Sequence, residues 1–280
     1  MIGKMRRAEF QDPFVRVLNH LENTLTASHI AAFPVVCWSP EDDVTEVIEK
    51  IAKDRLDFTH VPIRDSEGHV RWIVYREKIN EKHGKLVDHA MPIEERYIVD
   101  AICPLRETLL LLRDSGVLLV RSPESGQPDG ISGIINHADI QKTPVRLLLF
   151  AQITEIEARL RNRVSRESWE ENPHCDKYKN SAKGKRRDPD GSLPLINYLN
   201  PSQLMFLARA LDIPLHQKLS EDEFKILAKE LNELRNAIAH SNDIGCDLAA
   251  NPLDTIGAVN RAFDLAGGIL AAVIHLGRTD

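Results

Sequence analysis

Arg235, Asn236 and His240 form the group of residues in this sequence that is best suited to acid–base chemistry. Histidine titrates near neutral pH and can transfer protons, whereas arginine stays charged and grips phosphate with a planar fork of donors. Such a group could cleave RNA without a metal ion, with the ribose 2′-hydroxyl as the nucleophile. One histidine cannot take up one proton and deliver another at once, so a second copy of the site in a dimer would complete the reaction.

The specificity of this pattern comes from Asn236. An arginine followed five positions later by a histidine is expected roughly once by chance in such a chain, and Arg55/His60 and Arg64/His69 also show the spacing. Requiring asparagine directly after the arginine lowers the expectation to about 0.04 matches. Only Arg235-Asn236 meets this requirement, although an arginine, an asparagine and a histidine can also form an ordinary solvated helix surface.

A helix over residues 220–240 is predicted to position this group. Ser220 and Glu223 form a capping box, in which each side chain binds the backbone N–H of the other residue. Asn236 and His240, four residues apart, share one face, and Arg235 lies at the edge of the opposite, apolar stripe, from where its long side chain can reach outward. The residues of that stripe recur at helical spacing: Phe224, Leu227, Leu231, Leu234 and Ile238.

A weak internal repeat in residues 33–143 predicts two β-α-β-β-α units. The first copy has expected strands over 35–37, 59–63 and 70–75 and a helix over 39–53. The second has a helix over 104–113, strands over 117–120 and 131–135, and a helical start at 136–140. Each copy is too small to bury its own sheet, so we expect the two copies to pack against each other.

The end of the second copy reads Gly-Ile-Ile-Asn-His-Ala-Asp-Ile over residues 133–140, and with it the repeat resembles a pair of CBS domains, the nucleotide-sensing Bateman module. The resemblance implies an adenine-nucleotide-type ligand that contacts Gly133, Asn136 and Asp139, with Asn136 in place of the family's serine or threonine. A carboxylate at a helix start can accept hydrogen bonds from ribose hydroxyls, while the helix N-terminus faces phosphate.

The first copy departs from this pattern, because its corresponding residues lack a carboxylate. The sequence therefore predicts at most one such nucleotide site, and a CBS pair that serves only as a dimerising scaffold is an open alternative. The corresponding residues are Trp72, Tyr75 and Lys78.

Residues 144–280 read as an all-helical bundle. We expect helices over 145–169, 201–211, 220–240 and 251–276, with a polar connection over 172–194. Ala258, Ala262 and Ala266 form a small-residue line on the last helix, which would let another helix approach closely and suits either an intramolecular partner or a dimer. Six basic residues between 177 and 187 could bind RNA, but a solvated linker explains them equally well.

The R-N-x-x-x-H pattern in this helical setting resembles the HEPN family. The resemblance implies a metal-independent endoribonuclease that assembles its site in a homodimer, with Arg235, Asn236 and His240 as catalytic residues and no cofactor needed for catalysis. Because the 2′-hydroxyl is the nucleophile, DNA is not expected as a substrate. The alternative is a non-catalytic, nucleotide-sensing protein whose helical domain binds a protein partner.

The remaining features of the sequence set the broad class. A chain of 280 residues suits two domains, here preceded by an amphipathic helix within residues 1–32, whose expected stripe is Phe14, Val17, Leu18, Leu21 and Leu25. No apolar run is long enough to span a membrane and no export signal is apparent. The four cysteines form no C-x-x-C pair, which fits a reducing cytoplasm. A net charge of −6 disfavours a general nucleic-acid coat.

Overall fold

The structure is a computed structural model, and it describes residues 13–53, 59–79, 83–165, 167, 169–188, 191–213 and 220–239. The chain divides into two compact units, Glu22–Val145 and a second unit made of Met1–Leu21 with Arg146–Asp280. An α+β N-terminal part followed by a helical part is therefore confirmed. Each unit is described by itself below.

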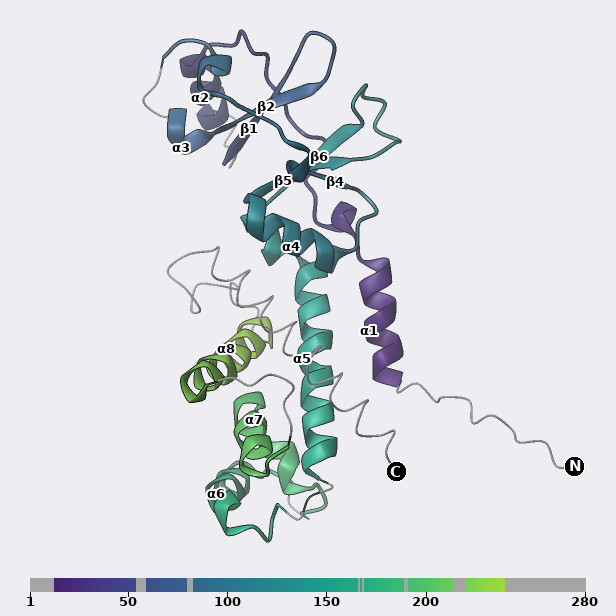
Figure 1. Ribbon diagram of the computed structural model, residues 1–280, viewed down its shortest axis with the longest axis vertical. Coiled ribbons are helices and arrows are strands. Elements are labelled where there is room, and N and C mark those ends of the chain that lie inside the picture. The colour runs from purple at the N-terminus through teal and green to yellow at the C-terminus, as the bar shows by residue number, and fades with distance from the viewer. Residues whose placement is uncertain are drawn as a thin grey trace, which may run out of the picture. The chain divides into compact units, whose positions relative to one another are not determined.

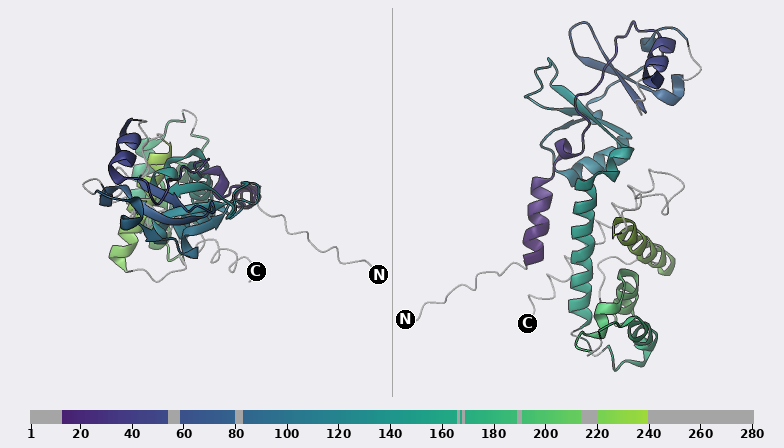
Figure 2. Two further views of the ribbon diagram at one scale, coloured as in Figure 1. Left: turned by 90° about the horizontal axis from the view of Figure 1, so that it is seen from above. Right: turned by 180° about the vertical axis from the view of Figure 1, so that it is seen from behind.

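The α+β unit contains two three-stranded sheets, one from each copy of the repeat (Figures 1 and 2). In the first sheet all neighbouring strands are antiparallel, whereas in the second β4 pairs with β5 in parallel and β5 pairs with β6 in antiparallel fashion. The strands of the first sheet are β1 (His60–Arg64), β2 (Val70–Tyr75) and β3 (Met91–Pro92). Those of the second are β4 (Ile98–Asp100), β5 (Val117–Arg121) and β6 (Ile131–Asn136).

Among the described residues of this unit, three α-helices and four 3₁₀ turns accompany the sheets. The α-helices are α2 (Val44–Lys53), α3 (Arg76–Ile79) and α4 (Leu105–Ser115). The 3₁₀ turns are η1 (Ala27–His29), η2 (Leu86–His89), η3 (Glu95–Tyr97) and η4 (His137–Gln141). Helix α4 ends at Gly116, whose φ of 78° is left-handed and therefore suits glycine at this C-cap.

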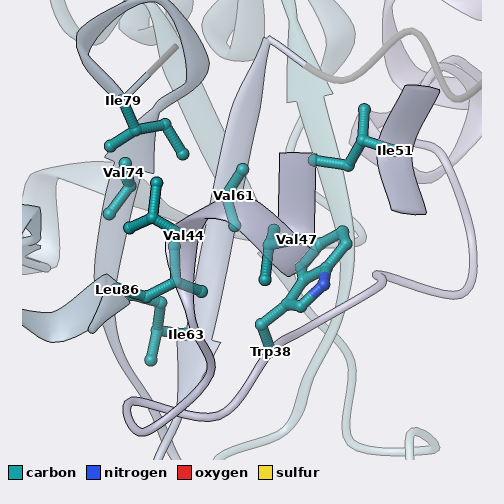
Figure 3. Packing of buried hydrophobic residues seen from close by; sticks show 9 residues of the cluster. All are labelled: Trp38, Val44, Val47, Ile51, Val61, Ile63, Val74, Ile79 and Leu86. Carbon is teal, nitrogen blue, oxygen red and sulfur yellow. The ribbon is translucent and has the colours of Figure 1, made fainter. Parts of the chain in front are cut away.

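The first copy has its own apolar core between α2 and the first sheet (Figure 3). Val44, Val47 and Ile51 recur at helical spacing on α2 and are buried against residues of β1 and β2. Trp38 closes the same core from the segment before α2, and its backbone N–H donates to Pro62. The apolar face of α2 is thus buried within the first copy itself.

A second apolar cluster joins the two copies. Val70 and Ile73 of β2 pack in it with β5 and β6 residues, among them Val117 and Ile131. Asp129 strengthens this junction, because one carboxylate oxygen accepts the Val70 N–H at 2.5 Å and the other accepts the Ile131 N–H at 2.9 Å. The two copies therefore share a core, as expected of units too small to bury their own sheets.

The helical unit is built from long and short helices. Its described helices are α1 (Pro13–Thr24), α5 (Thr143–Val164), α6 (Asp176–Lys185), α7 (Pro201–Ala210) and α8 (Glu221–Ala239), of which α1 and α5 each begin or end in the α+β unit. The 3₁₀ turns η5 (Pro173–Cys175) and η6 (Leu195–Tyr198) connect them. Helix α7 packs on α8, where the rings of Phe206 and Phe224 meet edge to face at 5.2 Å. No helix within the described ranges is long and apolar enough to cross a membrane.

Several expectations for the elements are corrected. Residues 35–37 are no strand, because only single backbone contacts such as Val35 N–H to Ser132 O tie this segment to the sheets. The polar connection over 172–194 contains α6, which buries Tyr178 and Ala182 on one face. Val17 is 55% exposed rather than buried. The expected helix over 251–276 lies outside the described residues.

Candidate functional site

The end of β6 positions the predicted nucleotide residues. Asn136 caps the turn η4: its Oδ1 accepts the Ala138 N–H at 2.8 Å, and its own backbone N–H donates to Asp139 Oδ2 at 2.7 Å. This is a capping box, in which an asparagine and an aspartate replace the usual residue pair. The structure therefore brings Asn136 and Asp139 together through local backbone geometry.

Both oxygens of the Asp139 carboxylate are engaged by the protein itself. Oδ2 accepts the Asn136 N–H, and Oδ1 forms an ion pair with Lys142 Nζ at 2.8 Å. Asp139 is only 7% exposed, whereas the Lys142 side chain is 39% exposed and also donates to Ile30 O. Ribose hydroxyls could reach Asp139 Oδ1 only where Lys142 yields its place or shares the oxygen.

Gly133 is required by a close approach. A Cβ at this position would lie 2.6 Å from Cε1 of Phe33, far inside van der Waals contact. The Phe33 ring therefore lies directly on the backbone of β6, and it is 48% exposed. Gly133 thus has a packing role here, and the exposed ring beside it offers an apolar surface to a flat group.

Two histidines at strand ends, one buried and one partly buried, were missed from the sequence. His60 begins β1, is 8% exposed, and its Nδ1 lies 2.7 Å from Thr59 Oγ1. His137 follows Asn136, and its Cε1 lies 3.6 Å from the point where a Cβ on Gly116 would stand. The Nε2 atoms of both rings are buried, and neither has a hydrogen-bond partner among the residues that the structure describes. For His137 the sequence did contain one signal of a role in the site, namely its place directly after Asn136.

The environment keeps both imidazoles neutral. Burial first, and repulsion from His137 second, together lower the pKa of His60 from 6.5 to about 4. Burial also lowers the pKa of His137. The Tyr75 ring packs edge-on against His60 at 4.8 Å between centroids. At neutral pH these two rings are therefore uncharged, and each presents an unsatisfied nitrogen.

The group in the helical unit lies at the end of α8. Ser220 and Glu223 form the predicted capping box. The Ser220 hydroxyl donates to Glu223 Oε2 at 2.6 Å and the Ser220 N–H at 2.8 Å, and these two bonds lower the pKa of Glu223. The predicted stripe is buried at Phe224, Leu227, Leu231 and Leu234, and Ile238 is partly buried. Arg235 Nη1 lies 3.4 Å from Asn236 Oδ1. His240 lies outside the described residues.

A carboxylate from α5, not anticipated from the sequence, holds Arg235. Glu157 Oε1 lies 3.8 Å from Arg235 Nε, and Glu157 Oε2 accepts from Arg161 Nη2 at 2.7 Å. The Glu157 side chain is 12% exposed, whereas that of Arg235 is 44% exposed. Two guanidinium groups therefore share one carboxylate.

One further cluster has ligand-type side chains. Within the described ranges, Asp65, Glu67 and His69 bring three potential metal-ligand atoms to within 4.8 Å of one another. The Asp65 oxygens already accept the backbone N–H groups of Glu67 and His69 and the side chain of Arg71. This network closes the turn between β1 and β2, which accounts for the cluster without a metal ion.

No family model and no curated protein matches the chain. Several solved structures are similar to part of this chain. The structure of the CBS domain of a bacterial CNNM/CorC-family Mg²⁺ transporter in complex with ATP is 16% identical over 47% of this chain and 94% of its own, with a TM-score of 0.37. A putative acetoin utilization protein (AcuB) from Vibrio cholerae is 17% identical over 44% and 93%, with a TM-score of 0.37. CBSX2 in complex with AMP is 14% identical over 41% and 92%, with a TM-score of 0.34.

The two copies of the repeat differ at their corresponding positions. Lys78 of the first copy lies over the Tyr75 ring, 4.9 Å from its centroid, where the second copy has Asp139 and Asn136. The Tyr75 hydroxyl has its pKa raised by burial. The first copy therefore offers an aromatic ring and a cation, and the second offers an amide and a carboxylate.

Proposed function

We propose that this chain is a cytoplasmic, nucleotide-regulated endoribonuclease that acts as a homodimer. In this proposal the α+β unit, as a CBS pair, binds an adenine-nucleotide-type ligand, and the helical unit, as a HEPN-type domain, cleaves RNA without a metal ion. The catalytic part of the proposal is supported by the Arg235–Asn236 pair on α8. The Arg235 side chain is 44% exposed, and its charged guanidinium group lies 3.8 Å from Glu157. The predicted partner residue of this pair is His240.

The chemistry assigns a different task to each residue. Arg235 would neutralise the phosphorane formed when the 2′-hydroxyl attacks, because its donors stay charged and match two phosphate oxygens. Asn236 would orient the scissile phosphate or Arg235 through its amide. His240 would accept the 2′-hydroxyl proton, and His240 of the second copy would protonate the leaving 5′-oxygen. Glu157 holds Arg235 and does not need to touch the RNA.

The regulatory part of the proposal uses the turn after β6. Ribose hydroxyls would bind Asp139 in competition with Lys142, and Asn136 at the start of η4 would face the phosphate group. The exposed face of the Phe33 ring next to Gly133 would pack against the flat base. Lys142 lies directly before α5 in the chain, so its displacement by a ligand offers a route to the helical unit.

The catalytic proposal is tested by RNA cleavage in EDTA. We expect wild-type protein to cut single-stranded RNA, His240→Ala to lose roughly 10²–10⁴ in rate as expected for a general acid–base group, and Arg235→Lys to lose most activity because lysine lacks the bidentate grip. His20→Ala, an exposed histidine on α1, is the matched control and should retain full activity. Cleavage that survives His240→Ala or that requires Mg²⁺ would refute the proposal. Intact RNA together with a stable protein partner would favour the partner-binding alternative.

The ligand proposal is tested separately by calorimetry. We expect ATP or AMP to bind, and Asp139→Ala to weaken that binding by about 1.5–3 kcal/mol, the range for a charge-assisted hydrogen bond. Lys78→Ala changes the corresponding position of the first copy and should have a much smaller effect. Absence of binding at millimolar nucleotide would remove the sensing role and leave the CBS pair as a scaffold.

A further inference from the structure

We infer that the exposed surface of helix α6 and the turn at its C-terminal end bind the phosphate backbone of single-stranded RNA without reading its bases. The inference rests on the proposed RNA cleavage and adds to it the surface that holds the substrate. Most of the basic run between residues 177 and 187 belongs to α6, so it is not the solvated linker that the sequence left open. Four exposed basic residues form this α6 basic surface: Lys177, Lys183, Lys185 and Arg187.

The α6 basic surface belongs to a packed helix. Tyr178 and Ala182 are buried and anchor the inner face of α6 in the helical unit. Ser181 of α6 accepts from Gln203 of α7 at 2.7 Å, and Gln203 in turn accepts from Lys185 Nζ at 2.9 Å. Helix α7 also packs on α8, which carries the candidate catalytic pair (Figure 1). Charges on such a helix lose less conformational entropy on binding than charges on a loose linker.

The turn after α6 is held by its own hydrogen bonds. Arg186 donates from Nε and Nη2 to the two oxygens of Asp188, at 2.9 and 3.2 Å, and Asp188 also accepts the Leu193 N–H at 3.1 Å. Hydrogen bonds from Arg186 and then Tyr198 lower the pKa of Asp188, so this carboxylate stays charged and neutralises Arg186. Arg187 is exposed, and its Nη1 donates to a backbone carbonyl instead.

The charges of the α6 basic surface are unpaired. Within the described ranges none of its four side chains has a carboxylate at ion-pair distance, whereas Lys179 of the same helix is paired with Asp176 at 2.5 Å. Lys177 lies over the ring of Tyr178, 4.8 Å from its centroid, and Lys185 donates to a neutral amide. The whole chain has a net charge of −6, so four unpaired cations on one short stretch form a local site for a polyanion.

Helix stability accounts for only half of this surface. Cations in the last turn interact favourably with the helix dipole, which explains Lys183 and Lys185. Lys177 lies in the first turn, where the dipole disfavours a cation, and Arg187 follows the end of the helix. The acidic segment 170–171 precedes α6, so the excess of positive charge lies toward the C-terminal end of the helix.

A phosphate backbone fits this surface better than bases or an acidic peptide. Tyr178 is the only aromatic residue between 176 and 187, and at 7% exposure it cannot stack on a base. Lysine and arginine bind phosphate oxygens whatever the base. Protein interfaces are usually anchored by aromatic or apolar side chains, and the exposed residues of α6 include none.

The experiment measures binding of a fluorescent 2′-O-methyl RNA strand to the full chain in EDTA, at about 50 to 200 mM salt. The methyl groups remove the nucleophile, so binding is measured without cleavage. We expect Lys177→Gln, Lys183→Gln and Arg187→Gln together to weaken binding about tenfold or more at the lowest salt. The slope of log affinity against log salt should shrink by about 2, because each phosphate contact on a single strand accounts for ~0.7. Mixed and all-uridine strands should respond alike.

A charge-matched control replaces three exposed lysines elsewhere, by Lys50→Gln, Lys53→Gln and Lys229→Gln on α2 and α8. It changes the net charge by the same amount and should leave affinity and slope nearly unchanged. Glutamine has nearly the helix propensity of lysine, so both variants should fold, which circular dichroism verifies. With cleavable RNA, the α6 variant should raise KM and keep kcat, because its contacts are the same in the ground state and the transition state.

The outcomes separate the inference from the proposed function. Equal weakening by the two variants, no weakening by either, or competition by polyglutamate as strong as that by unlabelled RNA overturns the inference, whereas cleavage by the wild type leaves the proposed function intact. RNA that binds with the expected slopes but is not cleaved supports the α6 basic surface and removes only the catalytic proposal. RNA that neither binds nor is cleaved overturns both.

Discussion

Replacing His60 by asparagine should make the α+β unit less sensitive to acid. In the folded chain the pKa of His60 is about 4 rather than 6.5, because its ring is buried. Between those pH values the unfolded chain binds a proton that the folded chain does not, so the free energy of unfolding falls as pH falls. At about 1.4 kcal/mol per pH unit, His60 alone accounts for a loss of about 3 kcal/mol between pH 6.5 and pH 4. Below pH 4 it contributes no further loss.

The measurement is urea unfolding of wild type and His60→Asn from pH 7.5 to pH 4, followed by tryptophan fluorescence, to which the buried Trp38 contributes. Asparagine can keep the bond to Thr59 but carries no titrating group, so the difference in stability between the two proteins should shrink by about 3 kcal/mol over this range. Carboxylates lose the same stability in both proteins and cancel. A constant difference across the range, or the same change in a His83→Asn control at an exposed histidine, would show that His60 is not held neutral by burial.

Three further substitutions test the geometry elsewhere. Asp129→Ala should destabilise the α+β unit by about 2–4 kcal/mol in urea unfolding, because two backbone N–H groups at the junction of the sheets lose their acceptor; an unchanged midpoint would contradict this. Gly133→Ala should cost about 1–3 kcal/mol through overlap with Phe33, and the cost should vanish in a Phe33→Ala background, which a double-mutant cycle measures. Glu157→Gln should lower RNA cleavage less than tenfold, since a partly exposed ion pair is worth about 1 kcal/mol at most, whereas a loss as large as that of Arg235→Lys would make Glu157 itself catalytic.

Local sequence signals predicted most elements of the α+β unit. The strand expected over residues 70–75 is β2 (Val70–Tyr75), and the others shift by one residue at most at an end. Alternating or continuous apolar runs fix such strands because side-chain burial repeats along them. Residues 35–37 looked the same but found no partner strand, since pairing depends on distant segments. The two short strands β3 and β4 were not predicted, because their pairing also depends on segments that lie far away in the chain.

Helix ends and helix faces were predictable to different degrees. The capping box at Ser220 fixed the start of α8, because the cap is made by residues three apart. Val17 has the right spacing for a buried stripe on α1 yet is exposed. The spacing of apolar residues predicts a helix face, but it does not show whether another part of the protein covers that face. Helix α6 was not predicted because its many lysines resemble those of a polar linker. Its inward face is formed by the buried residues Tyr178 and Ala182.

The candidate sites show the same limit. Asn136 and Asp139 meet through a local cap, and Arg235 and Asn236 meet because they are adjacent, so the sequence could place each pair. Glu157 reaches Arg235 from a helix more than seventy residues away in the chain, and no local pattern announces such a contact. The effect of His137 on the pKa of His60 likewise joins residues from different copies, which no local pattern shows.

The most direct measurement of the central claim is the chemistry of the RNA ends that the purified protein produces in EDTA. A DNA strand with a single ribonucleotide, incubated with and without ATP, gives products that mass spectrometry identifies. The account predicts one cut, a 2′,3′-cyclic phosphate and a 5′-hydroxyl, a rate that changes with ATP, and no product with Arg235→Lys or with an all-DNA strand. Products with a 5′-phosphate, a need for Mg²⁺, or an intact strand under all conditions would contradict it.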